Sequence, residues 1–225
     1  MTPNQQVVPA VKWCMDKVGL RVYLVGSDYI YSRVINAIIK DEVSGLGGTV
    51  LGEAYLPLGG NDVKQAVHAI QAARPSFIIN SITGDTNTAL FDELLGAGLT
   101  PDKVPVLSFS IAELTMQRVR EKHGPAAVVG DLCAWSYFQS LGDDRNRKFV
   151  SSFRNRFGEK RGMNDPMESI YFGVHLWAQA AETTKSLTIS DLRESLGDQT
   201  YAAPEGLIYV DPKHCIPGAS SASAE

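Results

Sequence analysis

Residues 22–33 read Val-Tyr-Leu-Val-Gly-Ser-Asp-Tyr-Ile-Tyr-Ser-Arg, an apolar run followed by a polar turn and the start of a helical pattern. The run is short and stops at Gly26-Ser27-Asp28, which is typical of a buried strand. The apolar positions after the turn recur at helical spacing, at Val34, Ile35, Ile38 and Ile39. The stretch therefore predicts a strand, a tight loop and a helix. The alternative for the loop is a plain turn in which Asp28 only caps the helix.

The same alternation extends over the first half of the chain. Further strands are predicted at 49–55, 77–79, 104–109 and 126–133, and helices at 5–18, 31–44, 63–73, 88–97 and 113–122. Strands and helices that alternate about every thirty residues are the pattern of right-handed crossover units. The predicted fold class is therefore α/β, with a doubly wound parallel sheet.

Polar residues follow several of these strands. In open parallel sheets, ligands bind beyond the carboxyl ends of the strands, which all meet at one edge. We therefore predict that the residues after the first, third and fourth strands form one face of a ligand-binding cleft: Ser27, Asp28, Tyr29, Tyr31, Gly84, Asp85, Ser110 and Glu113. Phenol rings with hydroxyl groups, next to carboxylates that accept from N–H groups, suit a small neutral guest.

The second half of the chain has a different pattern. A helix over 143–157 carries Phe149, Phe153 and Phe157 four residues apart, which favours a core stripe. A helix over 166–184 is apolar around more than half of its circumference and needs cover on two sides. We expect exposed apolar surface at Tyr171, Leu176 and Trp177, and self-association through this helix. A short helix and two short strands complete the pattern up to Val210.

Composition excludes several classes of protein. The 225 residues are 44% hydrophobic with a net charge of -4, and the absence of a basic stripe argues against nucleic acid as a partner. No apolar run is long enough to span a bilayer, and no secretion signal is recognisable. The cysteines, Cys14, Cys133 and Cys215, are widely spaced, so neither a zinc site nor a disulfide framework is indicated.

No catalytic machinery is recognisable either. The chain lacks a Gly-x-Ser-x-Gly motif, and its four histidines are scattered without the pairing that a metal site needs. The sequence Thr83-Gly84-Asp85-Thr86 lacks the glycine spacing of a phosphate-binding loop. We therefore predict a protein that is not an enzyme, with no catalytic residue, no metal site and no cofactor.

Six short motifs resemble those of a known family. They are Pro3-Asn4-Gln5-Gln6, Val25-Gly26-Ser27-Asp28-Tyr29, Tyr55-Leu56-Pro57-Leu58-Gly59, Ala134-Trp135-Ser136-Tyr137-Phe138-Gln139-Ser140, Asp165-Pro166-Met167-Glu168 and Ala203-Pro204-Glu205-Gly206. In this order they resemble the substrate-binding proteins of urea and short-chain amide ABC transporters. The cytoplasmic amide sensor that regulates an aliphatic amidase operon is also similar. The Trp-x-Tyr-Phe-Gln-Ser and Asp-Pro-Met-Glu motifs favour the urea-transport branch.

The resemblance implies a type I periplasmic binding protein fold, truncated at the N-terminus. Residues 1–140 would be the second α/β lobe, and residues 141–214 lobe-crossing helices and terminal strands that belong to a mostly missing lobe. The aromatic residue after Gly-Ser-Asp would line the amide pocket, which implicates Tyr29 and also Tyr31. The implied partners are a small neutral amide such as urea, with another amide or a branched amino acid as alternatives, and the permease subunits of an ABC transporter. Full-length relatives would be periplasmic.

The tail over 215–225 does not resemble the family's ending. One choice of codons, read in another frame, gives His-Thr-Trp-Arg-Val-Phe-Arg-Ile-Gly-Arg, which does resemble the family's final strand. We therefore expect either a frameshift near His214, which resequencing the gene would test, or a disordered tail rich in serine and alanine.

Overall fold

The computed structural model describes residues 2–111, 113–213 and 217–219, and these residues form two compact units. The N-terminal unit comprises Thr2–Trp135, and the C-terminal unit begins at Ser136. The boundary between the two units therefore lies slightly before residue 140, the end of the second lobe that the sequence resemblance implied. None of the helices in the described ranges has the length and the apolar character that crossing a membrane requires.

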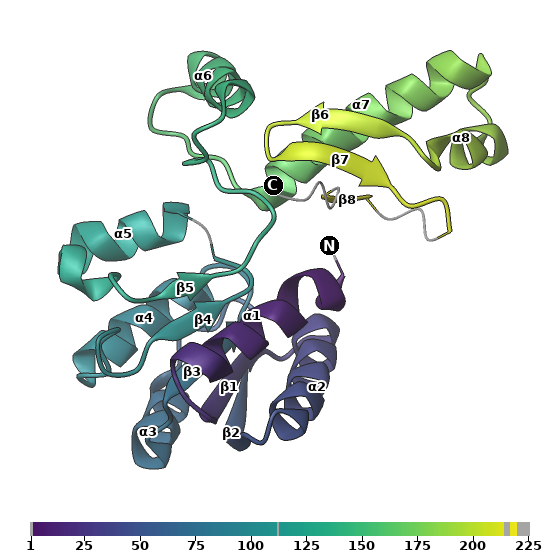
Figure 1. Cartoon of the computed structure of the whole chain (residues 1–225). Helices are drawn as coiled ribbons and strands as arrows, with labels where there is room; N and C mark the ends of the chain where they lie inside the picture. Colours follow the sequence, from purple (N-terminus) through teal and green to yellow (C-terminus); the bar gives the residue numbers. More distant parts are fainter. Residues whose placement is uncertain (1, 112, 214–216, 220–225) are drawn as a thin grey trace. The chain divides into compact units, whose positions relative to one another are not determined.

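The N-terminal unit alternates strands with helices (Figure 1). Its strands are β1 (Arg21–Ser27), β2 (Thr49–Leu56), β3 (Phe77–Ser81), β4 (Val106–Ser108) and β5 (Leu132–Cys133). Its helices are α1 (Pro3–Lys17), α2 (Ile30–Gly45), α3 (Lys64–Ala73), α4 (Thr86–Gly96) and α5 (Glu113–His123), with the short 3₁₀ turn η1 (Pro125–Ala127). All strand pairs are parallel, in the order β2-β1-β3-β4-β5. The predicted α/β fold with a parallel sheet is confirmed.

The fifth strand is much shorter than predicted. Only Leu132 and Cys133 pair with β4, and the residues before them form η1 and a loop. Gly124 and Gly130 have φ of +87° and +114°, and Pro125 has no N–H group to donate to a neighbouring strand. The predicted strand over 126–133 is therefore wrong for most of its length, because an apolar composition does not reveal this turn geometry.

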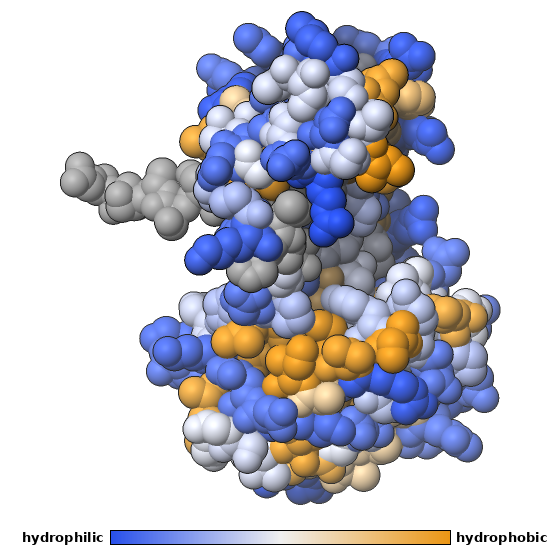
Figure 2. All heavy atoms as spheres, turned by 90° about the vertical axis from the view of Figure 1, so that its right-hand side faces the viewer, coloured by the Kyte–Doolittle hydropathy of each residue, from blue (hydrophilic) through white to orange (hydrophobic). Residues whose placement is uncertain are grey.

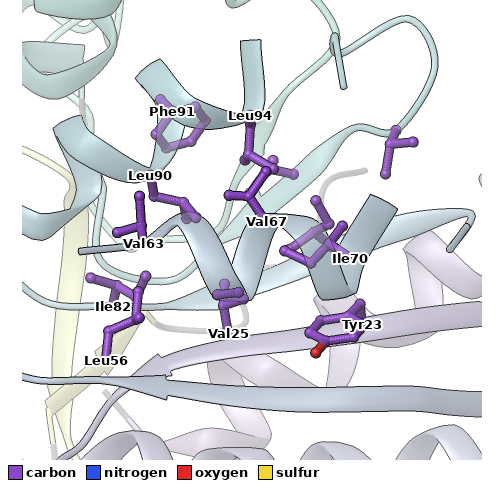
Figure 3. Close-up of a cluster of buried hydrophobic side chains, with 14 of the residues drawn as sticks. Tyr23, Val25, Leu56, Val63, Val67, Ile70, Ile82, Leu90, Phe91 and Leu94 are labelled. Carbon is purple, nitrogen blue, oxygen red and sulfur yellow. The ribbon is translucent and has the colours of Figure 1, made fainter. Parts of the chain in front are cut away.

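Two apolar layers cover the sheet because successive strand residues point to opposite faces. On one face, Tyr23 and Val25 of β1 pack with residues of α3 and α4, among them Ile70 and Leu90 (Figure 3). On the other face, Leu24 and its neighbours pack against α1 and α2. Helices on both faces bury the central strands β1, β3 and β4 almost entirely, whereas the edge strands β2 and β5 are only partly buried.

The C-terminal unit contains three helices and a small antiparallel sheet. The helices are α6 (Asp144–Phe157), α7 (Asp165–Thr184) and α8 (Ile189–Leu196), and the strands β6 (Thr200–Ala203), β7 (Gly206–Val210) and β8 (Pro217–Ala219) pair in the order β6-β7-β8. Leu176 of α7 is buried, so the expectation that it is exposed is wrong; it packs with Phe172 against the β6–β7 hairpin. Three residues of the tail, Pro217–Ala219, form β8. Cys215 and most of the remaining tail lie outside the described residues.

Candidate functional site

The end of β1 is fixed by a buried network of hydroxyl groups. Ser32 of α2 accepts a hydrogen bond from Ser27 N–H (3.1 Å) and donates one to the backbone oxygen of Ser81 at the end of β3 (2.7 Å). Ser27 is completely buried, and its own hydroxyl oxygen accepts from Thr83 N–H (3.0 Å). The Ser27 side chain therefore joins two strand ends and does not reach the surface in this structure.

Gly26 allows these strand ends to approach closely. A Cβ atom at this position would lie 2.7 Å from both Ser32 Cβ and Ser81 Oγ, closer than such atoms approach one another. The glycine of the Gly-Ser-Asp motif therefore has a packing function.

A second buried network joins β3 to β4. The Asn80 amide group donates to Asn87 Oδ1 (2.9 Å) and to Ser108 Oγ (3.2 Å), and Asn80 Oδ1 accepts from Ile82 N–H (2.9 Å). Ser110 donates its hydroxyl hydrogen to the backbone oxygen of Ile82. The ends of β1, β3 and β4 are thus hydrogen-bonded to one another at one edge of the sheet. Asn80 and Asn87 were not predicted from sequence, although two asparagines that flank a turn are a recognisable signal of side-chain bonds to loop backbone.

The loop that follows β1 exposes an aromatic residue. Tyr29 is 46% exposed, and the neighbouring Ile30 is 66% exposed. Figure 2 views the side on which α2 lies in Figure 1, and hydrophobic atoms gather there on the N-terminal unit. Tyr31 is only partly exposed and packs against the core between the sheet and α2, and this burial raises the pKa of its phenol. Of the two tyrosines, Tyr29 is the one that a ligand could cover.

The other predicted site residues at this edge of the sheet differ in their surroundings. Asp28 is exposed but already paired, because its Oδ1 accepts from Arg33 Nε (2.9 Å) and Nη2 (2.6 Å), and the Arg33 guanidinium lies 4.4 Å from the centre of the Tyr55 ring. Gly84 and Asp85 are exposed at the turn after β3, where Gly84 has a φ of +82°. Glu113 is partly buried at the start of α5. The predicted residues therefore gather at one edge, although only some of them present a side chain to solvent.

Replacing Asp28 by asparagine is expected to lower the free energy of unfolding by less than about 1 kcal/mol, because the ion pair with Arg33 is solvent-exposed. Chemical denaturation of the variant beside the wild type measures this. A much larger loss would mean that Asp28 holds the loop in place and is not free to turn towards a ligand.

The C-terminal unit contains a buried acidic pair that sequence reasoning missed. Glu168 of α7 is completely buried, and its Oε1 accepts from Glu205 N–H (3.4 Å). Burial and the charge of Glu205 raise the pKa of Glu168 to about 8. Burial and the charge of Asp165 raise the pKa of Glu205 to about 7. Among the described residues, the Oε2 atoms of both glutamates have no hydrogen-bond partner. Two glutamates 37 residues apart give no sequence signal that they meet.

Two of the motifs quoted from the sequence contact each other in this unit. Asp165 Oδ2 accepts from the backbone N–H groups of Ser136 (2.7 Å) and Tyr137 (3.1 Å), and Gln139 Oε1 accepts from Met163 N–H (3.1 Å). The Trp-Ser-Tyr-Phe-Gln-Ser and Asp-Pro-Met-Glu segments are therefore linked by hydrogen bonds, which gives a structural reason for finding them together. No group of histidine, cysteine and acidic residues in the described ranges could hold a metal ion.

Comparisons with known proteins agree with this fold. Residues 1–219 match the family model described as periplasmic binding protein domain. A curated relative, the Leu/Ile/Val-binding protein homolog 6 of Brucella suis biovar 1 (strain 1330), is 24% identical over 94% of this chain and 54% of its own length. The chain thus spans about half the length of the curated relatives that it matches over most of its residues.

Solved structures show the same fold. The solute-binding protein of an ABC transporter from Rhodopseudomonas palustris HaA2, in complex with p-hydroxybenzoic acid, is 19% identical with a TM-score of 0.86, over 97% of this chain and 59% of the other. The amino acid ABC transporter substrate-binding protein from Pseudomonas fluorescens Pf-5 is 16% identical with a TM-score of 0.78, over 99% of this chain and 60% of the other. The parallel sheet and the match over nearly the whole sequence place the chain in one family: it belongs to the periplasmic binding protein domain family.

Proposed function

We propose that this chain is part of the solute-binding component of an ABC importer, that it works without catalysis, and that its ligand is a small neutral amide such as urea. The observation that carries the proposal is the joined ends of β1, β3 and β4, which hold Tyr29 exposed beside Asp28 and Gly84. Relatives with the same fold are named as solute-binding proteins of ABC transporters. Urea or a short-chain amide is supported by the sequence motifs, whereas related structures name p-hydroxybenzoic acid and amino acids.

In this proposal the Tyr29 ring covers the ligand, and carboxylate oxygens at the same edge accept from its N–H groups. Such a ligand has few atoms, so tight binding needs a closed pocket that satisfies every hydrogen bond. A first lobe, present in the longer relatives, would supply the opposite wall. The full-length protein would be periplasmic and would deliver its ligand to permease subunits.

Calorimetric titration of urea, acetamide, 4-hydroxybenzoate and leucine tests the proposal on two proteins: this chain and a longer version that carries the first lobe. We expect the longer version to bind an amide at least about tenfold more tightly than 4-hydroxybenzoate or leucine, and this chain to bind all four weakly. In the longer version, Tyr29→Ala should weaken binding, whereas Leu46→Ala at the other end of α2 should not. Equal affinity of this chain and the longer version for the amides would contradict the proposal, and so would tighter binding of leucine or 4-hydroxybenzoate that Tyr29→Ala weakens.

The proposal also predicts self-association of this chain in isolation. Ile170, Val174 and Trp177 lie on one face of α7 and are 71%, 60% and 48% exposed, a stripe that the first lobe would cover. Sedimentation velocity should show concentration-dependent association of this chain. The variant with glutamine at all three positions should remain monomeric over the same range, whereas Leu187→Gln, which changes an exposed leucine outside α7, should still associate. Association that persists unchanged in the triple variant would rule out α7 as the contact.

A further inference from the structure

The C-terminal unit contains a cavity of about 500 Å³ that is separate from the strand ends of the N-terminal unit, since α6, α7 and β6 contribute its lining. Phe149, Phe153 and Phe157 line it from α6, and Tyr171 and Tyr201 from the other two elements. Cavities that bind small organic ligands measure about 300–1,000 Å³. This cavity is therefore large enough for a ligand with one or two rings.

The aromatic lining corrects one expectation from the sequence. The three phenylalanines of α6 were predicted to form a core stripe, but Phe157 is 49% exposed, and Phe149 and Phe153 are only partly buried. The Phe149 and Tyr171 rings lie 4.4 Å apart between centroids, and the Phe153 and Phe157 rings 4.8 Å apart. Phe149 and Phe153 thus pack on a core cluster of Tyr137, Val150 and Met163, and all three phenylalanine rings also line the cavity.

A row of cations on α6 borders the aromatic wall. Arg145, Lys148 and Arg156 line the cavity, and none of its described lining residues is acidic. The row follows from the helix, because Arg145, Lys148 and Arg156 are three and eight residues apart, close to one and two helical turns. The cavity is therefore positively charged although the whole chain carries a net charge of -4.

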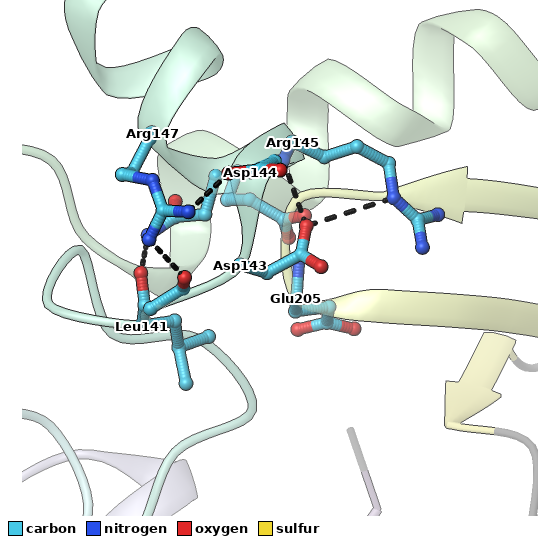
Figure 4. A network of polar contacts seen from close by, with 9 residues as sticks. Leu141, Asp143, Asp144, Arg145, Arg147 and Glu205 are labelled. Atoms are coloured by element: carbon cyan, nitrogen blue, oxygen red, sulfur yellow. Dashed lines mark hydrogen bonds and ion pairs between the residues drawn. The ribbon is translucent and has the colours of Figure 1, made fainter.

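The acidic residues at the start of α6 pair with Arg145 and Arg147 and not with Lys148 or Arg156. At the start of α6, Asp143 Oδ1 accepts from Arg145 N–H (2.8 Å) and lies 3.6 Å from Arg145 Nε, while Asp144 pairs with Arg147, which does not line the cavity (Figure 4). Lys148 makes no ion pair within the described ranges, and the Arg156 guanidinium lies 5.7 Å from the centre of the Phe157 ring. Lys148 and Arg156 can therefore both turn their charge towards an anion.

We propose that this cavity binds a small aromatic carboxylate, with its ring against the Phe149, Phe153 and Tyr171 side chains and its carboxylate between Lys148 and Arg156. Aromatic pairs gain stability beyond the burial of their area, and hydrogen bonds from a cation to a carboxylate are among the stronger ones. A neutral ring would lose the second contribution and an aliphatic acid the first. All of these residues belong to the C-terminal unit, whereas the proposed amide site is built from residues of the N-terminal unit.

Titration followed by backbone amide NMR tests the proposal, with benzoate as the probe. Benzamide has the same ring without the charge, and cyclohexanecarboxylate has the charge without the aromatic ring. We expect saturable shifts of α6 and β6 signals with benzoate, and at least about tenfold weaker binding of either analogue. The double variant Lys148→Gln/Arg156→Gln should weaken benzoate binding by about the same factor. Lys160→Gln/Arg161→Gln, which removes two cations beyond the cavity, should bind benzoate as the wild type does.

Three results would overturn the proposal. The first is equal binding of benzoate and benzamide, and the second is unchanged benzoate binding by the Lys148/Arg156 variant. The third is loss of the shifts in the longer version with the first lobe, because the cavity would then be a contact face for that lobe. Tyr29→Ala separates the two proposals: it should leave benzoate binding at α6 unchanged even if the amide proposal fails.

Discussion

The C-terminal unit is expected to lose stability as the pH rises from 4.5 to about 8, and replacing Glu168 by glutamine should abolish most of this loss. The pKa of Glu168 is raised above its ordinary value of 4.5 because the side chain is buried and faces the charge of Glu205. The folded state therefore holds this proton more tightly than the unfolded chain does. The corresponding stability is complete below pH 4.5 and is lost as the pH rises through about 8.

The effect is large because the site is fully buried. A shift of this size corresponds to a free energy on the order of 4 kcal/mol. Glutamine is neutral at every pH, so the Glu168→Gln variant should be more stable than the wild type near pH 8 and similar to it near pH 4.5. A smaller decrease of stability with rising pH should remain in the variant, because the pKa of Glu205 is also raised, to about 7.

The measurement must resolve the two units, because burial also raises the pKa of Asp131 in the N-terminal unit, to about 7. Hydrogen exchange of the β6 and β7 amides, corrected for the intrinsic pH dependence of exchange, reports on the C-terminal unit alone. Glu182→Gln, which changes an exposed glutamate on the same helix, is the matched control and should leave the slope as it is. An unchanged dependence of stability on pH in Glu168→Gln would show that a neighbouring group or solvent stabilises the charge of the Glu168 carboxylate in the folded state.

Replacing Asn80 by alanine is expected to lower the free energy of unfolding of the N-terminal unit by about 2 to 6 kcal/mol. The variant loses three buried hydrogen bonds, to Asn87, Ser108 and Ile82. The Ile82 N–H group and Asn87 Oδ1 would remain buried without these partners, and each such group costs about 1–3 kcal/mol. Because Asn80 joins the ends of β3 and β4, the same variant should also loosen the loops that carry Gly84 and Ser110.

Denaturation of Asn80→Ala followed by circular dichroism measures the loss. Asn61→Ala, which removes an exposed asparagine from the loop after β2, should change the free energy of unfolding by less than about 0.5 kcal/mol. A similarly small change in Asn80→Ala would show that water replaces the lost bonds and that this network does not fix the strand ends.

Much of the fold could be predicted because its signals are local. The run from Val22 to Val25 is apolar and buried on both faces of the sheet, and the helical spacing of Ile35 and Ile39 follows after the turn. Such patterns predict parallel strands and the edge at which their ends meet. They failed at 126–131, an otherwise apolar segment in which Gly130 has a positive φ and which follows directly after Gly124 and Pro125.

The site was predicted only in part, because burial depends on distant residues. Ser27 was expected in the turn after the first strand, but it is the last residue of β1, and its side chain is completely buried with its hydroxyl oxygen accepting from Thr83 N–H. Leu176 was expected on the surface, and the β6–β7 hairpin covers it. The acidic pair of Glu168 and Glu205 forms only when α7 and the hairpin pack together, so no motif spacing could have predicted its raised pKa values.

The central claim, that the joined strand ends of the N-terminal unit meet the ligand, is tested most directly by mapping binding onto the sequence. Backbone amide signals of the longer version would be followed by NMR while acetamide is added. We predict saturable shifts at residues 28–31, 83–85 and 110, with smaller shifts in α3 and in the β6–β7 hairpin. Saturable shifts that spare all three loops would contradict the account.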